Sequence, residues 1–162
     1  MRGGGTSSRL FQKIREDHGL CYAIESFGWG YSDTGLLGAH AATNSKLVGK
    51  LMAKVAEECA DLAGHGPNLA ELARTKAQIK AGLLMGLESS GARAEQLARQ
   101  VLALGAPIQA AVLEAHIEAV DKEAVRASAA RIFGSNRHVW AEIGPGAEGR
   151  HAHRFARSLA GA

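Results

Sequence analysis

Near the N-terminus, the pattern of apolar and polar positions changes from helical to extended. Leu10, Phe11 and Ile14 recur at the spacing of one helical face. Gly19 stands where a left-handed residue would end that helix. The mostly apolar run 20–27 that follows is typical of a largely buried strand. The pattern therefore predicts one helix that leads directly into one strand.

Two further strands and several helices are predicted after this junction. The strands are expected at 36–43, after a turn at 33–35, and at 137–144, where the apolar residues partly alternate. The helices are expected over about 45–63, from Asn68 to a break at 89–91, and over about 93–105, 108–120 and 122–133. Asn44 or Ser45, Asn68 and Asp121 are the expected N-caps, and Asn68 with Glu71 has the spacing of a capping box.

Strands and helices in this order predict an α+β fold, with helices packed on one face of an antiparallel sheet. We expect one domain over residues 1–146 and a flexible tail over 147–162. The apolar stripes within 77–89 and 93–105 are interpreted as core packing. A sheet of three strands leaves its edges open. We therefore expect an exposed sheet edge that a second copy of the chain or a preceding segment covers.

Composition and charge exclude several classes of function. The 162 residues are 46% hydrophobic and 22% charged, which is ordinary for a globular protein. The net charge of +3 is too small to indicate nucleic-acid or membrane-surface binding. No apolar run is long enough to span a bilayer, and the N-terminus lacks the features of a signal peptide. We expect a cytoplasmic location, no membrane span and no nucleic-acid partner.

The cysteines and histidines do not form a recognisable metal site. Cys21 and Cys59 are isolated, and two buried free thiols are a better interpretation than a disulfide. None of the seven histidines belongs to an H-x-x-E-H or H-E-x-x-H motif. His151 and His153 form an H-x-H pair, but two ligands rarely suffice for zinc.

Several segments together resemble one known family. Residues 3–22, GGGTSSRLFQKIREDHGLCY, resemble the glycine-rich segment and first helix in the C-terminal half of insulinase/pitrilysin-type zinc metallopeptidases. Within that family, the bacterial relatives of mitochondrial processing peptidase are the most similar subgroup. The resemblance continues in YSDTG (31–35), AQIKAGLLMGLES (77–89), RAEQLARQVLALG (93–105) and IEAVDKEAV (117–125), and spans roughly residues 3–146. It implies an incomplete metallopeptidase half, because the family has further strands before the glycine-rich segment.

The resemblance also implies two substrate-binding residues. In the family, an arginine and a tyrosine of the C-terminal half close over the active site and bind the peptide backbone around the scissile bond. Arg15 and Tyr22 match this pair, and Gly19 between them matches as well. A guanidinium or phenol aimed at the peptide oxygen would stabilise its developing negative charge. The alternative interpretation is that Arg15 is a solvated helix residue and Tyr22 a strand residue packed beside Leu20 and Ile24.

The family's zinc ligands lie in H-x-x-E-H plus a downstream glutamate, and this chain has no such motif. We therefore expect the chain to bind no zinc and to be inactive alone, and we expect zinc in the complete enzyme. The implied partners are a peptide substrate and an N-terminal zinc-binding half, in cis or in trans. A second function also fits the resemblance, because relatives that lack zinc ligands serve as structural or partner subunits.

Overall fold

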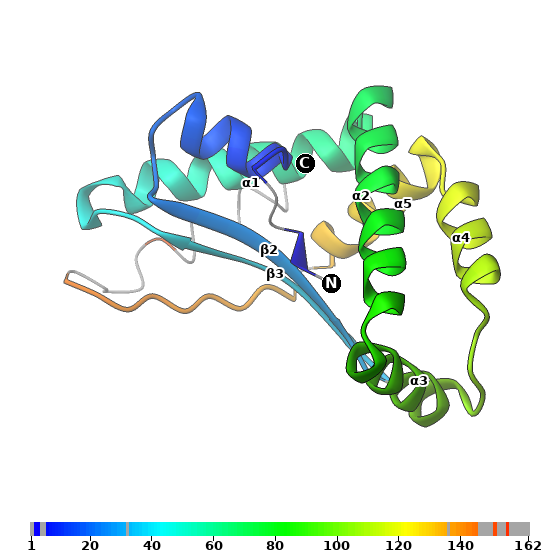
Figure 1. Ribbon diagram of the computed structural model, residues 1–162. Coiled ribbons are helices and arrows are strands. Elements are labelled where there is room, and N and C mark those ends of the chain that lie inside the picture. The colour runs from blue at the N-terminus through cyan, green and yellow to red at the C-terminus, as the bar shows by residue number, and fades with distance from the viewer. Residues whose placement is uncertain are drawn as a thin grey trace. The chain divides into compact units, whose positions relative to one another are not determined.

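The computed structural model describes residues 2–3, 6–31, 33–135, 137–145, 151 and 155. The chain divides into two compact units, one of residues 1–66 and 126–162 and the other of residues 67–125. Figure 1 shows the helices and strands that make up each unit. The predicted boundary between a domain and a tail at 146/147 stays a prediction, because residues 146–162 lie outside the described residues except for His151 and Phe155.

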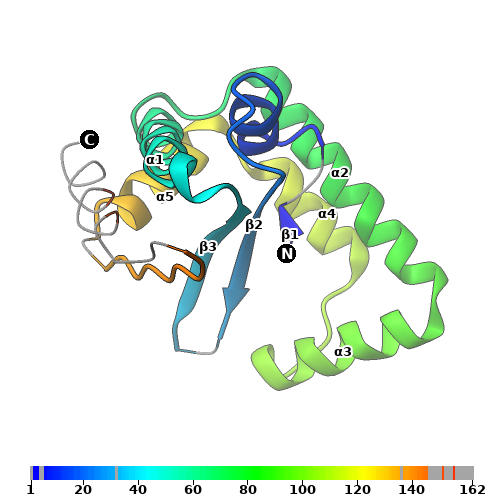
Figure 2. The same ribbon diagram turned by 90° about the vertical axis from the view of Figure 1, so that its left-hand side faces the viewer.

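The first unit contains an antiparallel sheet of three strands in the order β1-β2-β3 (Figure 2). The strands are β1 (Arg2–Gly3), β2 (Ala23–Gly30) and β3 (Gly35–Ala42). The β2–β3 pairing runs from Ala23 opposite Ala42 to Gly30 opposite Gly35 without an offset. Strands β2 and β3 confirm the predicted strands at 20–27 and 36–43, although β2 both starts and ends later than predicted.

The third predicted strand, at 137–144, is wrong. Residues 137–143 form no strand, and β1 at the N-terminus takes the third place in the sheet. The side chains of Val139 and Ile143 are almost fully exposed. An alternating pattern indicates which residues share a face, but a strand also needs a neighbouring edge for its backbone hydrogen bonds. No strand within the described residues pairs with this segment.

Helices cover one face of the sheet in this unit, as predicted. The π-helix η1 (Phe11–Glu16) and the helix α1 (Val48–His65) contact each other, and η1 contacts β2. The 3₁₀ turn η2 (Ser45–Leu47), capped by the side chain of Asn44, leads into α1. The core between helices and sheet contains the buried residues Ile14, Leu20, Cys21, Ile24 and Leu51, with Leu10, Phe11, Ala41, Leu47 and Val55 packed against it. This α+β arrangement fixes the segment that joins η1 to β2.

The other face of the sheet is open among the described residues. Phe27 and Trp29 stack with their ring centroids 4.9 Å apart. The Phe27 ring also lies over Gly38 on β3, where an added Cβ would meet it at 2.4 Å. Trp29 and Leu36, which face each other across the strands, remain exposed.

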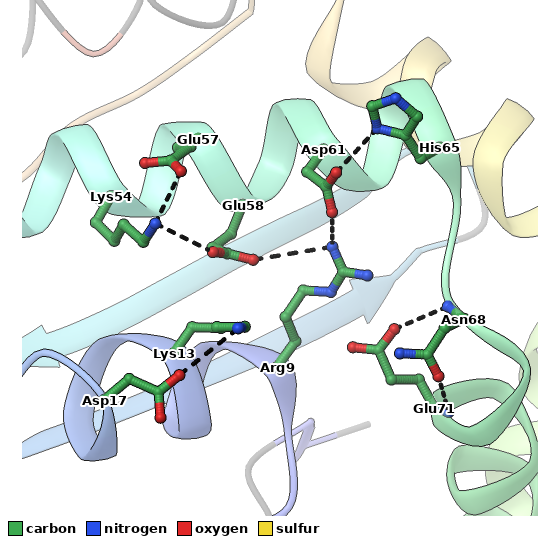
Figure 3. Close-up of polar contacts among 10 residues, drawn as sticks. All are labelled: Arg9, Lys13, Asp17, Lys54, Glu57, Glu58, Asp61, His65, Asn68 and Glu71. Atoms are coloured by element: carbon green, nitrogen blue, oxygen red, sulfur yellow. Dashed lines mark hydrogen bonds and ion pairs between the residues drawn. The ribbon is translucent and has the colours of Figure 1, made fainter.

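The second unit is helical and contains α2 (Leu69–Glu88), α3 (Ser90–Leu104) and α4 (Ala110–Ala119). Asn68 and Glu71 form the predicted capping box at the start of α2 (Figure 3). Helix α2 packs against α3 and α4, and Lys76 donates a hydrogen bond to the Glu118 carbonyl at 2.7 Å. The interpretation of the α2 and α3 stripes as core is wrong, since neither helix has a buried side chain.

The last described helix, α5 (Lys122–Phe133), begins in the second unit and ends in the first. The amide of Ala124 donates to the Asp121 carboxylate at 2.7 Å, so Asp121 is the predicted N-cap. No helix of the described residues is both long enough and apolar enough to cross a membrane.

Candidate functional site: the turn between η1 and β2

Arg15 lies on η1 with its side chain partly exposed. Its guanidinium carbon lies 4.6 Å from the centroid of the Phe11 ring. Its Nε lies 3.8 Å from a carboxylate oxygen of Glu16. The positive charge therefore sits on an aromatic face and remains accessible from solvent.

The chain reverses direction at Gly19, between the two predicted site residues. Gly19 has φ +59°, a left-handed conformation that disfavours residues with a Cβ. Its amide donates to the Arg15 carbonyl at 3.0 Å, and the Leu20 amide donates to the Ile14 carbonyl at 3.0 Å. Ile14 and Leu20 are both buried. The backbone that carries the site is thus fixed by hydrogen bonds and by the core below it.

Tyr22 follows this turn and precedes β2. Its amide donates to the Ala42 carbonyl at 2.8 Å, so its backbone is tied to the sheet. Its side chain is 74% exposed, which differs from the alternative interpretation of a packed strand residue. The structure thus places Arg15 and Tyr22 on the two sides of one fixed turn, but no hydrogen bond among the described residues joins them.

Sequence reasoning missed a group of charged residues that joins Arg9, just before η1, to α1 (Figure 3). Arg9 Nη1 lies 2.5 Å from Asp61 Oδ2 and 3.8 Å from Glu58 Oε2. Glu58 also lies 3.6 Å from Lys54 Nζ. Glu58 is buried, and no other charged side chain of the described residues is. A signal was available, because Glu58 falls on the apolar stripe of α1 between Val55 and Leu62, where a charge needs a buried partner.

The ionisation of this group follows from its contacts. Burial raises the pKa of Asp61, but hydrogen bonds to Arg9 and His65 outweigh it, so the net pKa lies below the ordinary value. Burial and the adjacent Glu58 carboxylate raise the pKa of Cys59 to about 11, against a smaller effect of Arg9. Asp61 is therefore ionised at neutral pH, and Cys59 is a neutral thiol.

Both cysteines are free, as predicted. Burial raises the pKa of Cys21, and the positive charge of Arg15 opposes this effect. Neither thiol has the lowered pKa that a nucleophilic cysteine needs.

The described histidines do not assemble a metal centre. His65 pairs with Asp61 at 2.9 Å, and His138 lies 3.1 Å from the Phe133 carbonyl. No group of three His, Cys, Asp or Glu side chains in the described part of the chain is arranged to hold a metal ion. His153 lies outside the described residues. The residues seen here do not fit a zinc site, and the absence of zinc from this chain stays a prediction.

Comparisons with known sequences agree with the resemblance described above. Residues 1–79 match the profile of the peptidase M16 inactive domain. An uncharacterized zinc protease of Streptomyces coelicolor is 34% identical over 143 residues, which are 88% of this chain and 31% of that protein. The beta subunit of the mitochondrial-processing peptidase of Mus musculus is 33% identical over 149 residues, which are 88% of this chain and 29% of that subunit.

A solved structure shares the fold. A chain in complex III2 from Candida albicans with Inz-5 bound has a TM-score of 0.67 and 26% identity, and the match covers 76% of this chain and 30% of that one. This chain spans about a third of the length of the curated relatives that it matches. The chain belongs to the M16 metallopeptidase family and corresponds to the C-terminal, inactive domain of its zinc proteases.

Proposed function

We propose that this chain supplies the wall of a zinc endopeptidase that closes over the peptide substrate opposite the metal. The observation that carries the proposal is the pair of solvent-accessible side chains, Arg15 and Tyr22, on the two sides of a rigid turn. Side chains on a fixed backbone lose little freedom when they bind a ligand. The substrates would be peptides or unfolded segments bound in an extended conformation.

The chemistry of this pair suits peptide hydrolysis. The oxygen of the scissile carbonyl gains negative charge as the carbonyl carbon becomes tetrahedral. A guanidinium or phenolic O–H directed at that oxygen binds it more tightly in the transition state than in the ground state. Arg15 presents several fixed donors, and it is always charged. The zinc ion and its ligands would belong to the N-terminal half, in cis or in trans.

The first experiment compares this chain with the polypeptide extended upstream in the same reading frame. Zinc content and endopeptidase activity are measured on both. We expect zinc and activity in the extended protein alone. Zinc-dependent turnover by the 162-residue chain itself would contradict the proposal that another half binds the zinc.

The second experiment tests the two residues in the active, extended protein. We expect Arg15→Ala to lower kcat about 10²–10³-fold at constant zinc content, the usual loss when an oxyanion donor is removed. Tyr22→Phe removes only the hydroxyl group and should lower kcat as well. Lys13→Ala is the matched control, because Lys13 is an exposed cation on the same helix, paired with Asp17 at 3.6 Å. Equal turnover for Arg15→Ala and Lys13→Ala would refute the proposed role of Arg15.

A second candidate is a non-catalytic structural or partner subunit. The observation that favours it is the fold shared with a chain of complex III2. Under this proposal the extended protein would bind no zinc, and it would co-purify with a chain that carries H-x-x-E-H. Loss of Arg15 would then leave the amount of assembled complex unchanged.

The open sheet edge suggests where a partner strand would bind. In the described residues no strand pairs with the outer edge of β3, and the strand carries no lysine, glutamate or proline to protect that edge. We propose that a second copy of the chain, or the N-terminal half, adds a strand there. Ala39→Lys on β3 should weaken self-association measured by light scattering, while Ala53→Lys on the exposed side of α1 should not.

A further inference from the structure

The helix that carries Arg15 has an unusual backbone. Residues Phe11–Glu16 form a π-helix, and the Asp17 amide donates to the Gln12 carbonyl, five residues back, at 2.9 Å. Such helices are rare, and their wider turn is often found at functional sites. On this helix the guanidinium of Arg15 lies over the ring of Phe11, four residues earlier.

Phe11 is itself held in place. It is partly buried and packs against the core cluster that contains Ile14 and Leu51. Its amide also donates to the Ser8 hydroxyl at 3.3 Å. A ring anchored in the core is a fixed platform, and a cation on such a platform loses conformations that would carry it away from the turn.

Two contacts restrain the Arg15 guanidinium. The Phe11 ring lies 4.6 Å from its carbon, and the Glu16 carboxylate lies 3.8 Å from its Nε. Glu16 is exposed, so solvent screens its attraction strongly. The aromatic platform depends less on screening, because one side of the ring is buried. Phe11 is therefore the residue that can set the direction of Arg15 without touching the substrate.

We infer that Phe11 is a positioning residue that holds Arg15 in the conformation required for substrate binding. This inference rests on the function proposed above. Its consequence is that loss of the aromatic face should reduce transition-state stabilisation even when an apolar side chain still fills the same core position.

The test uses Phe11→Leu and Phe11→Tyr in the extended, zinc-containing protein. Leucine keeps the apolar packing and removes the ring, and tyrosine restores the ring. We expect Phe11→Leu to lower kcat about two- to fivefold with KM unchanged, as a partly exposed cation–π contact predicts. Phe11→Tyr should retain the wild-type kcat. Phe27→Leu is the matched control, since Phe27 lies on the sheet and stacks with Trp29.

A double mutant separates this inference from the proposed function. Phe11→Leu should have no further effect on kcat in an Arg15→Ala background, because its role depends on Arg15. If Arg15→Ala lowers kcat and Phe11→Leu does not, the inference is overturned while the proposed function stands. A larger, additive loss in the double mutant also overturns it.

If Arg15→Ala has no effect on kcat, NMR spectroscopy can still test whether the Arg15 side chain lies on the Phe11 ring. The ring of Phe11 should shift the Arg15 side-chain proton resonances in NMR spectra of the 162-residue chain. Phe11→Leu should abolish this ring-current shift and Phe11→Tyr should retain it. Resonances that are identical in the wild-type chain and in Phe11→Leu would overturn the inference.

Discussion

Replacement of Arg9 by alanine should destabilise the first unit more than the loss of an exposed charged side chain usually does. The Arg9 side chain is 18% exposed, and it contacts Asp61 at 2.5 Å and Glu58 at 3.8 Å. A charge-assisted hydrogen bond contributes about 1.5–3 kcal/mol when shielded from water. The Asp61 side chain is 49% exposed, so solvent screening reduces that contribution to about 1 kcal/mol.

Glu58 makes a second contribution to the destabilisation caused by Arg9→Ala. Its side chain is 9% exposed, and after the loss of Arg9 at 3.8 Å it keeps one cationic partner, Lys54, at 3.6 Å. A buried carboxylate that has lost one partner costs about 1–2 kcal/mol. The expected total for Arg9→Ala is therefore about 2–3 kcal/mol in the free energy of unfolding. Glu58→Gln in the same background should recover part of this loss, because it removes the under-paired charge.

The assay is urea denaturation of the 162-residue chain followed by circular dichroism, with hydrogen exchange of residues 9–16 as a local readout. Arg99→Ala is the matched control. Arg99 also pairs with a carboxylate at 2.5 Å, that of Glu95, but its side chain is 78% exposed. Its loss should cost less than about 0.5 kcal/mol. Equal costs for Arg9→Ala and Arg99→Ala would refute the argument from burial.

The same ion pair predicts a pH dependence. The folded pKa of Asp61 lies below its ordinary value of 3.8, because the hydrogen bonds from Arg9 and His65 outweigh burial. A group with a lowered pKa contributes stability that is present above its unfolded pKa and lost as pH falls through its folded pKa. The difference in unfolding free energy between the wild-type chain and Asp61→Asn should therefore shrink as the pH is lowered below 3.8. A difference that stays constant over this range would contradict the assignment.

Three further predictions concern single residues. Gly19→Ala should lower the free energy of unfolding by about 1–2 kcal/mol, because φ is +59° there, although the added Cβ meets nothing within 4 Å. Gly64→Ala, within helix α1 and also without a close neighbour, should raise the stability slightly, and thermal unfolding of both variants tests this. Cys59, with its pKa of about 11, should react with iodoacetamide at a rate that still rises above pH 9, and a plateau near pH 9 would contradict the burial effect. Asn68→Ala should cost about 1 kcal/mol by removing the capping box, and unchanged hydrogen exchange in the first turn of α2 would contradict it.

Much of the secondary structure was predictable because its signals are local. The capping box of Asn68 and Glu71, the N-cap of Asp121 and the left-handed Gly19 each act on the backbone within a few residues. The apolar residue Ile14 indicated the inner face of the first helix for the same reason. Such features need no knowledge of the rest of the chain.

Contacts between distant segments explain what sequence reasoning missed. The segment 137–143 has a strand-like pattern, but a strand also needs backbone hydrogen bonds to another segment, and this segment pairs with no strand of the described residues although the outer edge of β3 is unpaired. The apolar stripe of α3 resembles that of a core helix, but its burial depends on which elements lie against it. The ion pair of Arg9 with Asp61 joins residues 52 positions apart. No local pattern encodes such a separation.

The sequence by itself determined the family resemblance, the α+β class, most helix limits and the identity of Arg15 and Tyr22 as candidates, because these depend on residue type and short spacing. Only the tertiary structure decided that Tyr22 is exposed, that Arg15 lies on the ring of Phe11 and that η1 is a π-helix. The physical reason is that exposure and side-chain direction are set by the packing of η1 and β2 on one core. That packing exists only once residues far apart in the chain have come together.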